Sequence, residues 1–121
     1  MGTRISAPPS GRITQGTRDS LLRPGMWSVY DTRRSYSIES VGHSRFLVLL
    51  MPQRLHSGWS NAVETLAARA LEGQGTPRIA MAGLAALLRD EELPDADGQQ
   101  LIEDSTVMLL EHALLRSAAR F

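Results

Sequence analysis

Histidines, serines and carboxylates are the side chains of this 121-residue sequence that could carry out metal-dependent or acid–base chemistry. The three histidines are His43, His56 and His112, and no two of them have the i, i+2 spacing of strand ligands or the i, i+4 spacing of helix ligands. No serine lies in a Gly-x-Ser-x-Gly turn, and the chain has no cysteine. The sequence therefore predicts no metal, no cofactor and no catalytic residue, and a protein that is not an enzyme.

Neighbouring acids occur at Asp90-Glu91-Glu92 and at Glu103-Asp104. A pair of carboxylates works as general acid and base only where an apolar pocket separates their pKa values. Acids next to one another at the ends of helices are ordinarily solvated. No Gly-x-Gly-x-x-Gly follows a strand pattern, so the sequence also predicts no phosphate-binding loop.

The charge balance argues against direct binding to nucleic acid. The chain has 13 basic and 13 acidic residues, whereas contacts to phosphates require a basic surplus. Residues 1–60 hold eight Arg against three acids, and residues 61–121 hold five Arg against ten acids. The two halves are therefore expected to form different kinds of structure that attract each other.

Neither a membrane span nor a secretion signal is expected. The longest apolar run, Phe46 to Met51, is far shorter than the roughly 20 residues that cross a bilayer. The amino-terminal residues have no apolar stretch typical of a secretion signal. We therefore expect a cytoplasmic protein without a membrane partner.

The elements that must position any site fall into a β part and a helical part. Residues 1–11 are rich in Pro, Gly and Ser and are expected to form a flexible tail, followed by one domain over residues 12–121. Its β part covers residues 12–52 and its helical part residues 55–118. Alternating and β-branched residues between turn signals predict short strands at 12–15, 26–30, 35–39 and 45–51, in an antiparallel sheet or barrel.

Three helices are expected after Pro52. The first covers residues 60–71, although residues 68–71 could equally return to the sheet. The second begins at Thr76-Pro77, with Thr76 as N-cap, and ends in the acidic run Asp90-Glu91-Glu92, before Pro94. The third begins near Asp95 or Asp97, where a negative charge suits the helix dipole. The second helix has five core candidates at helical spacing: Ile79, Met81, Leu84, Leu87 and Leu88.

The third helix is apolar over more width than one buried face requires. Leu101, Met108 and Leu115 lie seven residues apart, a spacing that keeps one seam of a helix facing a partner helix. Burial within the chain and contact with a second subunit are equally compatible with this pattern. The residues that we predict for a dimer interface are Leu101, Met108, Leu109, His112 and Leu115.

Two stretches of the chain carry a family resemblance. Residues 22–38, LRPGMWSVYDTRRSYSI, and residues 46–55, FLVLLMPQRL, resemble the sensor domain of AraC/XylS-type transcriptional regulators. The first has the leucine, the Pro-Gly turn, the apolar strand and the Asp-Thr segment before a tyrosine that are typical of that domain. Met26 stands where the family usually has an acid, and Ser35 where it usually has proline.

The resemblance implies an α+β fold, with a partial cupin-like antiparallel β-sheet or barrel followed by two to three carboxyl-terminal helices. It further implies the later part of an effector-sensing and dimerisation domain, without the helix-turn-helix part that binds DNA. A small effector would sit inside the barrel, and the helices would make the dimer contacts. Trp27, Tyr30 and Tyr36 are the predicted ligand-binding residues, with ordinary core packing as the alternative for each. Alternation along a strand prevents Trp27 and Tyr30 from facing the same way.

Partners and rival functions follow from the same resemblance. We expect self-association or pairing with a related regulator, and a small-molecule effector. A partial barrel exposes strand edges and an apolar face, which another chain would have to cover. The alternatives are a truncated paralogue that pairs with full-length regulators, a small cupin-type enzyme, and a remnant reading frame without function.

Overall fold

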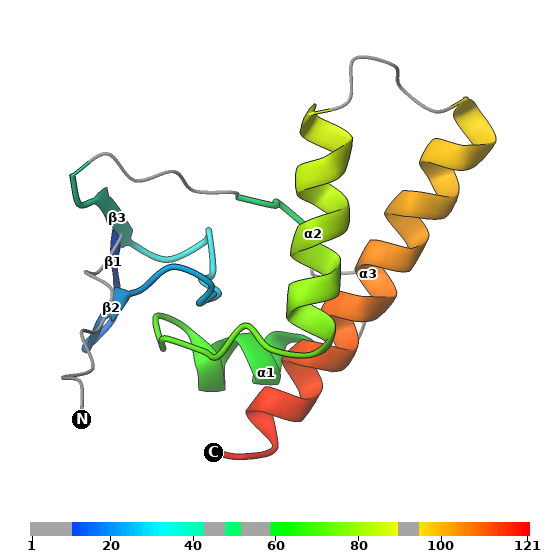
Figure 1. The fold of residues 1–121 in the computed structure, drawn as a ribbon. Coiled ribbons are helices and arrows are strands. Elements are labelled where there is room, and N and C mark those ends of the chain that lie inside the picture. The colour runs from blue at the N-terminus through cyan, green and yellow to red at the C-terminus, as the bar shows by residue number, and fades with distance from the viewer. Residues whose placement is uncertain (1–10, 43–47, 52–58, 90–94) are drawn as a thin grey trace, which may run out of the picture.

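The computed structural model describes residues 11–42, 48–51, 59–89 and 95–121, except for the side chains of Leu87 and Leu88. Three short strands lie at one side of the molecule, and two long helices lie at the other (Figure 1). A third, shorter helix lies low between them. This is an α+β arrangement, a partial cupin-like sheet followed by helices, as predicted. Of the predicted tail, only Gly11 is among the described residues.

The sheet has three antiparallel strands in the order β2-β1-β3. They are β1 (Gly11–Gln15), β2 (Arg18–Leu22) and β3 (Tyr36–Ser40). In the central strand Ile13 pairs with Ser20 on one side and with Ile38 on the other. Gly11, Ile13 and Gln15 are buried and Arg12 between them is exposed, which is the alternation of a sheet with one covered face.

Two of the four predicted strands are confirmed, one is wrong, and one is described only in part. Residues 12–15 lie in β1 and residues 36–39 in β3, whereas β2 was not predicted. Residues 26–30 do not form a strand of the sheet; Trp27 makes one isolated bridge, to Leu71. Of the predicted strand at 45–51, residues 48–51 are irregular and the others lie outside the described residues.

The segment around Trp27 pairs with the chain that leaves the first helix rather than with the sheet. Trp27 and Leu71 exchange two backbone hydrogen bonds of 3.0 and 2.8 Å, and the Ala68 N–H donates to the Val29 carbonyl at 2.9 Å. A Cβ on Gly73 would lie 1.7 Å from the Gly25 carbonyl oxygen, so only glycine permits this close approach. This second partner is the physical reason why residues 26–30 do not join β1–β3.

The helices are α1 (Trp59–Leu66), α2 (Thr76–Arg89) and α3 (Ala96–Ala118). Asp95 caps α3, since its carboxylate accepts a 2.7 Å hydrogen bond from the Gly98 N–H, so the predicted start is confirmed. The predicted first helix ends earlier, because Ala68 has a left-handed φ of 59°. Leu71 then returns to extended pairing, but with Trp27 and not with the sheet.

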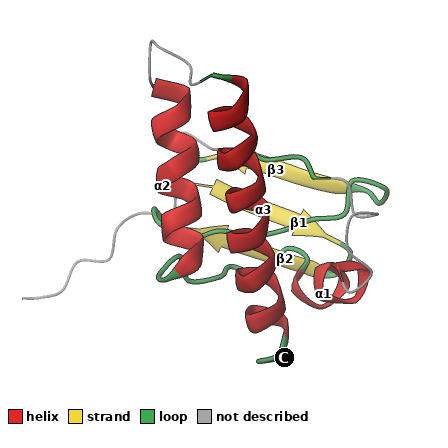
Figure 2. Cartoon of the chain, turned by 90° about the vertical axis from the view of Figure 1, so that its right-hand side faces the viewer, coloured by secondary structure: helices red, strands yellow, loops and turns green. Residues whose placement is uncertain are grey.

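The core lies where α1 meets α3. Trp59, Val63 and Leu66 of α1 pack with Leu71 and with Leu114 of α3, and Trp27 and Val29 pack against this cluster. α2 and α3 lie side by side (Figure 2). On α2 the buried residues are Pro77 and Ala80, with Met81 and Leu84 half-buried.

The prediction of Ile79 as a core residue is wrong. Ile79 is exposed, because the face of α2 that turns inward is the one that carries Pro77 and Ala80. Leu87 and Leu88 lie outside the described side chains. No described helix has the length and apolar character required to cross a bilayer.

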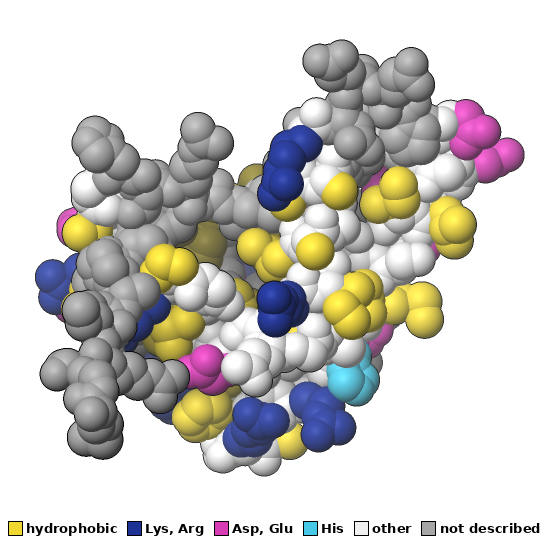
Figure 3. All heavy atoms as spheres, in the orientation of Figure 1, with side chains coloured by type: hydrophobic (Ala, Val, Ile, Leu, Met, Phe, Trp, Pro, Cys, Tyr) yellow, Lys and Arg dark blue, Asp and Glu magenta, His cyan; other side chains and the backbone are white. Residues whose placement is uncertain are grey.

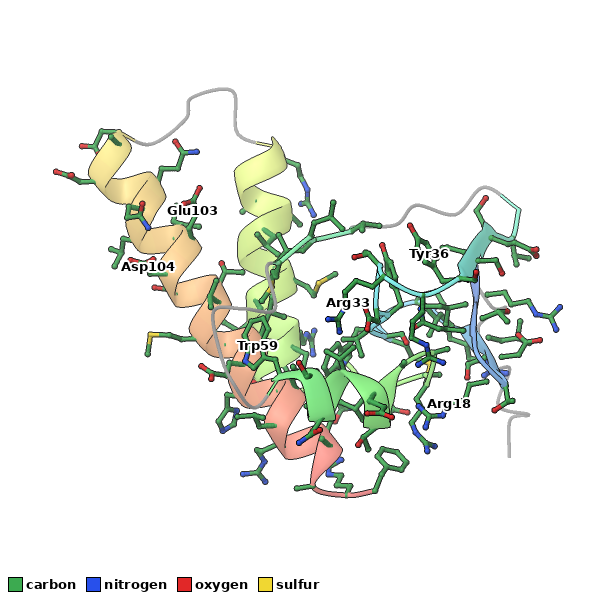
Figure 4. All side chains as sticks on the ribbon, turned by 180° about the vertical axis from the view of Figure 1, so that it is seen from behind. Arg18, Arg33, Tyr36, Trp59, Glu103 and Asp104 are labelled. Atoms are coloured by element: carbon green, nitrogen blue, oxygen red, sulfur yellow. The ribbon has the colours of Figure 1, made fainter. Side chains whose placement is uncertain are left out.

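One arginine joins the sheet to the helices. Nη1 of Arg18, on β2, donates to the carbonyl oxygens of Glu64, Thr65 and Ala67 at 3.0, 2.8 and 3.1 Å. The last carbonyls of a helix have no hydrogen-bond partner within the helix, and they form the negative end of the helix dipole. A guanidinium placed there donates hydrogen bonds to these carbonyls and brings a positive charge to the negative end. Figure 4 shows Arg18 on the sheet side of α1.

We expect Arg18→Ala to lower the free energy of unfolding by about 1–3 kcal/mol, because it leaves the carbonyls of Glu64 and Ala67 without their charged donor. Urea denaturation of the full chain would measure this loss. Arg12→Ala is the matched control, since Arg12 lies at the neighbouring strand surface in an exposed ion pair with Asp19. Equal losses for the two variants would contradict the capping role of Arg18.

Candidate effector site and pairing surface

Two of the three aromatic residues predicted for ligand binding lie against each other. The rings of Tyr30 and Tyr36 have centroids 4.5 Å apart and planes inclined by 36°. Tyr36 is exposed at the start of β3, and Tyr30 is half-buried. Burial, and secondarily the charge of Tyr36, raises the pKa of the Tyr30 phenol above its ordinary value. Tyr30 therefore stays a neutral hydrogen-bonding group across the physiological range.

An open groove of about 470 Å³ lies beside Tyr36, where β1 ends and β3 begins. Thr14, Gln15 and Gly16 line it from β1 and its turn, and residues 34–37 line it from the β3 side. A Cβ on Gly16 would lie 3.1 Å from the Arg34 guanidinium, so the glycine lets this cation lie over the turn. The groove thus combines a phenol ring, a guanidinium and small hydroxyl side chains.

Gln15 holds the loop that carries this site. It is 3% exposed, and its amide makes two hydrogen bonds with the backbone of Asp31: Nε2 donates to the carbonyl at 2.7 Å, and the Asp31 N–H donates to Oε1 at 2.9 Å. A side-chain amide that pairs with a peptide group in this way acts as an added strand partner. The position of Tyr36 therefore depends on a buried glutamine.

The Asp31 carboxylate is engaged locally. It accepts hydrogen bonds from the backbone N–H, Nε and Nη2 of Arg33 at 3.0, 3.1 and 3.0 Å. These bonds and the arginine charge hold the pKa of Asp31 below its ordinary value. The Asp31 carboxylate is therefore ionised, and its bonds to Arg33 stabilise the turn at residues 31–33.

Sequence reasoning missed Gln15 and Arg34 as residues of the site. Neither residue was named as a candidate, and Gln15 entered only as the last residue of the predicted strand at 12–15. The available signal was a glutamine at the inward-facing position of β1, two residues from Ile13. Its partner, the peptide group of Asp31, is set by the fold and is not visible in the spacing.

Trp27 lies elsewhere. Its indole Nε1 donates to the Glu72 carbonyl at 2.9 Å, its backbone pairs with Leu71, and its ring packs against the core. The structure thus brings Tyr30 and Tyr36 together and ties Trp27 to the chain after α1. Effector binding by the three aromatic residues stays a prediction.

The predicted interface residues lie along α3, on the side away from the core. Leu101 is 68% exposed, Met108 69% and Leu115 44%, while Thr106, Ala113 and Leu114 on the other side are buried. His112 is exposed, and its Nδ1 lies 3.3 Å from the Thr76 hydroxyl on α2; Leu109 is half-buried. Figure 3 shows hydrophobic side chains gathered above the histidine. α3 therefore presents an apolar surface that internal packing does not use.

Among the described residues, no three histidine or carboxylate side chains gather as they would around a metal ion. His43 and His56 lie outside the described residues. His112 is placed beside Thr76 on α2.

A short antiparallel sheet joined to a helical layer makes this an α+β domain of partial cupin-like type. The family model of the AraC-binding-like domain matches residues 6–115, most of the chain. The chain belongs to this family, the ligand-sensing module of AraC-type regulators. Neither the curated proteins nor the solved structures that were compared match the chain.

We expect Gln15→Leu to lower the free energy of unfolding by about 1–3 kcal/mol, because it leaves the Asp31 peptide group without a partner. It should also change the ring-current NMR shifts of the Tyr30–Tyr36 pair. Thr14→Val is the matched control, since Thr14 is half-buried and its hydroxyl makes only a 3.3 Å bond to Asp19. Unchanged tyrosine shifts in Gln15→Leu would show that Gln15 does not position the pair.

Proposed function

We propose that the chain is the effector-sensing and pairing module of a bacterial AraC-type transcriptional regulator. It acts by binding a small molecule and another protein rather than by catalysis, and no residue of this chain is assigned to DNA contact. A cytoplasmic location accompanies this function, because a transcription regulator acts where the DNA is. The family of the domain supports the sensing role, and α3 supports the pairing role.

The exposed apolar side of α3 is the observation that carries the pairing role. We call Leu101, Met108 and Leu115 the α3 seam. Each is exposed although the helix is anchored from its opposite side by Leu114. Apolar side chains at a seven-residue spacing fit the grooves of a second helix.

The Tyr30–Tyr36 pair and its groove are the proposed effector site. A phenol face stacks on a planar or apolar part of a ligand, and a guanidinium such as that of Arg34 binds a carboxylate or another polar group. The Gln15 and Asp31 side chains of this region are already engaged in holding the loop. The residues left to meet a ligand therefore favour binding over acid–base chemistry.

We expect Met108→Arg to abolish pairing of the full chain or to weaken it by at least about tenfold, because a charge would replace an apolar side chain at the centre of the seam. Analytical ultracentrifugation over a concentration series, alone and with a related regulator, would measure this. Leu50→Arg is the matched control: Leu50 is 71% exposed against 69% for Met108, but lies outside the helices. Pairing that tolerates Met108→Arg would contradict the role of α3.

We expect Tyr36→Ala to remove the thermal stabilisation that small polar aromatic or carboxylate compounds give the wild-type chain, because it deletes one ring of the pair. Thermal-shift measurement of such a compound set on both proteins would test this. Leu21→Ala is the control, since Leu21 and Tyr36 are each 46% exposed on edge strands. Compounds that stabilise Tyr36→Ala as well as the wild type would place the effector elsewhere.

A further inference from the structure

A row of acids runs along one flank of the α3 seam. Asp97, Asp104 and Glu111 are seven residues apart, so they lie on one line along the helix, next to the line of Leu101, Met108 and Leu115. Asp97 and Asp104 are exposed and Glu111 is half-buried. Asp104 accepts one hydrogen bond, of 2.9 Å, from Gln100 of the same helix. We call these three residues the acidic flank.

The other flank of the seam is different in kind. Ile102 and Leu109 are half-buried there, and Arg116 near the carboxyl end of the helix is its charged residue. The seam therefore has one acidic and one mainly apolar border. In helix pairs these flanking positions decide which partner binds and in which direction.

A second copy of α3 does not complement this arrangement. If two copies lie antiparallel, each acidic flank faces the other acidic flank, and like charges repel. If they lie parallel, the acidic flank faces Ile102, Leu109 and Arg116 of the second copy. Only Glu111 then meets an opposite charge, at Arg116.

We propose that α3 pairs with a helix of a different protein, whose apolar seven-residue seam is bordered by arginine or lysine. This inference rests on the proposed pairing role of the α3 seam and adds the chemistry of the partner. Basic side chains at seven-residue spacing would face Asp97, Asp104 and Glu111 along the whole contact. The same charges penalise self-pairing, so the acidic flank selects the partner.

Two synthetic helical peptides test this proposal with the full chain. Both carry leucine at the seam positions, and they differ only in having arginine or glutamate at the flanking positions. Fluorescence anisotropy should show that the arginine peptide binds about tenfold or more tightly than the glutamate peptide at moderate ionic strength. The preference should shrink as salt is raised.

The charge variants identify the residues responsible. Asp104→Arg should reduce the preference for the arginine peptide to about twofold or less, because it reverses the middle charge of the row. Glu103→Arg makes the same change of charge at the adjacent residue. The two side chains leave α3 on different sides, as Figure 4 shows, and Glu103 does not border the seam. Glu103→Arg should therefore keep the preference.

The outcomes separate this inference from the proposed function. If the two peptides bind equally and Met108→Arg abolishes the binding of both, the inference of a basic partner is wrong. Pairing through α3 is then retained. A tight homodimer that depends on Met108 and excludes both peptides would lead to the same conclusion. Equal effects of Asp104→Arg and Glu103→Arg would also overturn the inference, because they would show a general attraction between charges. Binding of neither peptide, with no self-association, would overturn both.

Discussion

The contact between the Arg18 guanidinium and the end of α1 sets the arrangement of the whole molecule. The sheet is small and has only one covered face, so it cannot supply a large core of its own. The apolar cluster lies instead between α1 and α3. A charged donor that serves three helix-end carbonyls fixes the sheet to that cluster, and each bond is stronger because the donor is charged.

The chain just after α1 extends this connection in two directions. Ala68 turns the backbone with a left-handed φ, and Leu71 then pairs with Trp27. Arg69 donates to the Thr65 carbonyl at 2.8 Å and places its guanidinium 4.2 Å from the centre of the Phe121 ring. The end of α1 thus contacts the sheet, the segment before β3 and the end of the chain. Through the end of α1, these contacts link β2, the segment before β3 and the carboxyl-terminal residue Phe121.

Local features of the fold could be predicted from the sequence, whereas features that depend on distant partners could not. The start of α3 follows from Asp95, because a helix cap needs only its own neighbours. α2 does begin at Thr76, but the predicted Thr76 cap is wrong: Gly75 provides the carbonyl that accepts from the Ile79 N–H, and the Thr76 hydroxyl lies 3.3 Å from His112 Nδ1. The strand at 26–30 was wrong because a strand is defined by what it pairs with, and Trp27 pairs with Leu71. β2 was missed because it is a polar edge strand, placed by its hairpin with β1 rather than by hydrophobic alternation.

The same distinction holds for the candidate site. Tyr30 and Tyr36 could be singled out by residue type, and they do meet. Gln15 and Arg34 could not, because the role of a polar side chain is decided by the backbone groups that the fold brings to it. The residue type predicts which side chains are able to bind a ligand. The position in the fold decides which of these side chains are not already engaged by other groups of the protein.

The two-sided character of α3 explains why its sequence left two alternatives open. A helix with apolar residues on opposite sides lacks the single stripe that marks an ordinary surface helix. In the structure Ala113 and Leu114 anchor α3 within the molecule, while Leu101 and Met108 face away from it. Because the anchoring and outward residues are different, substitutions in the seam can change pairing without removing the core. A helix fixed in this way has an ordered backbone before a partner binds, which lowers the entropy lost on binding.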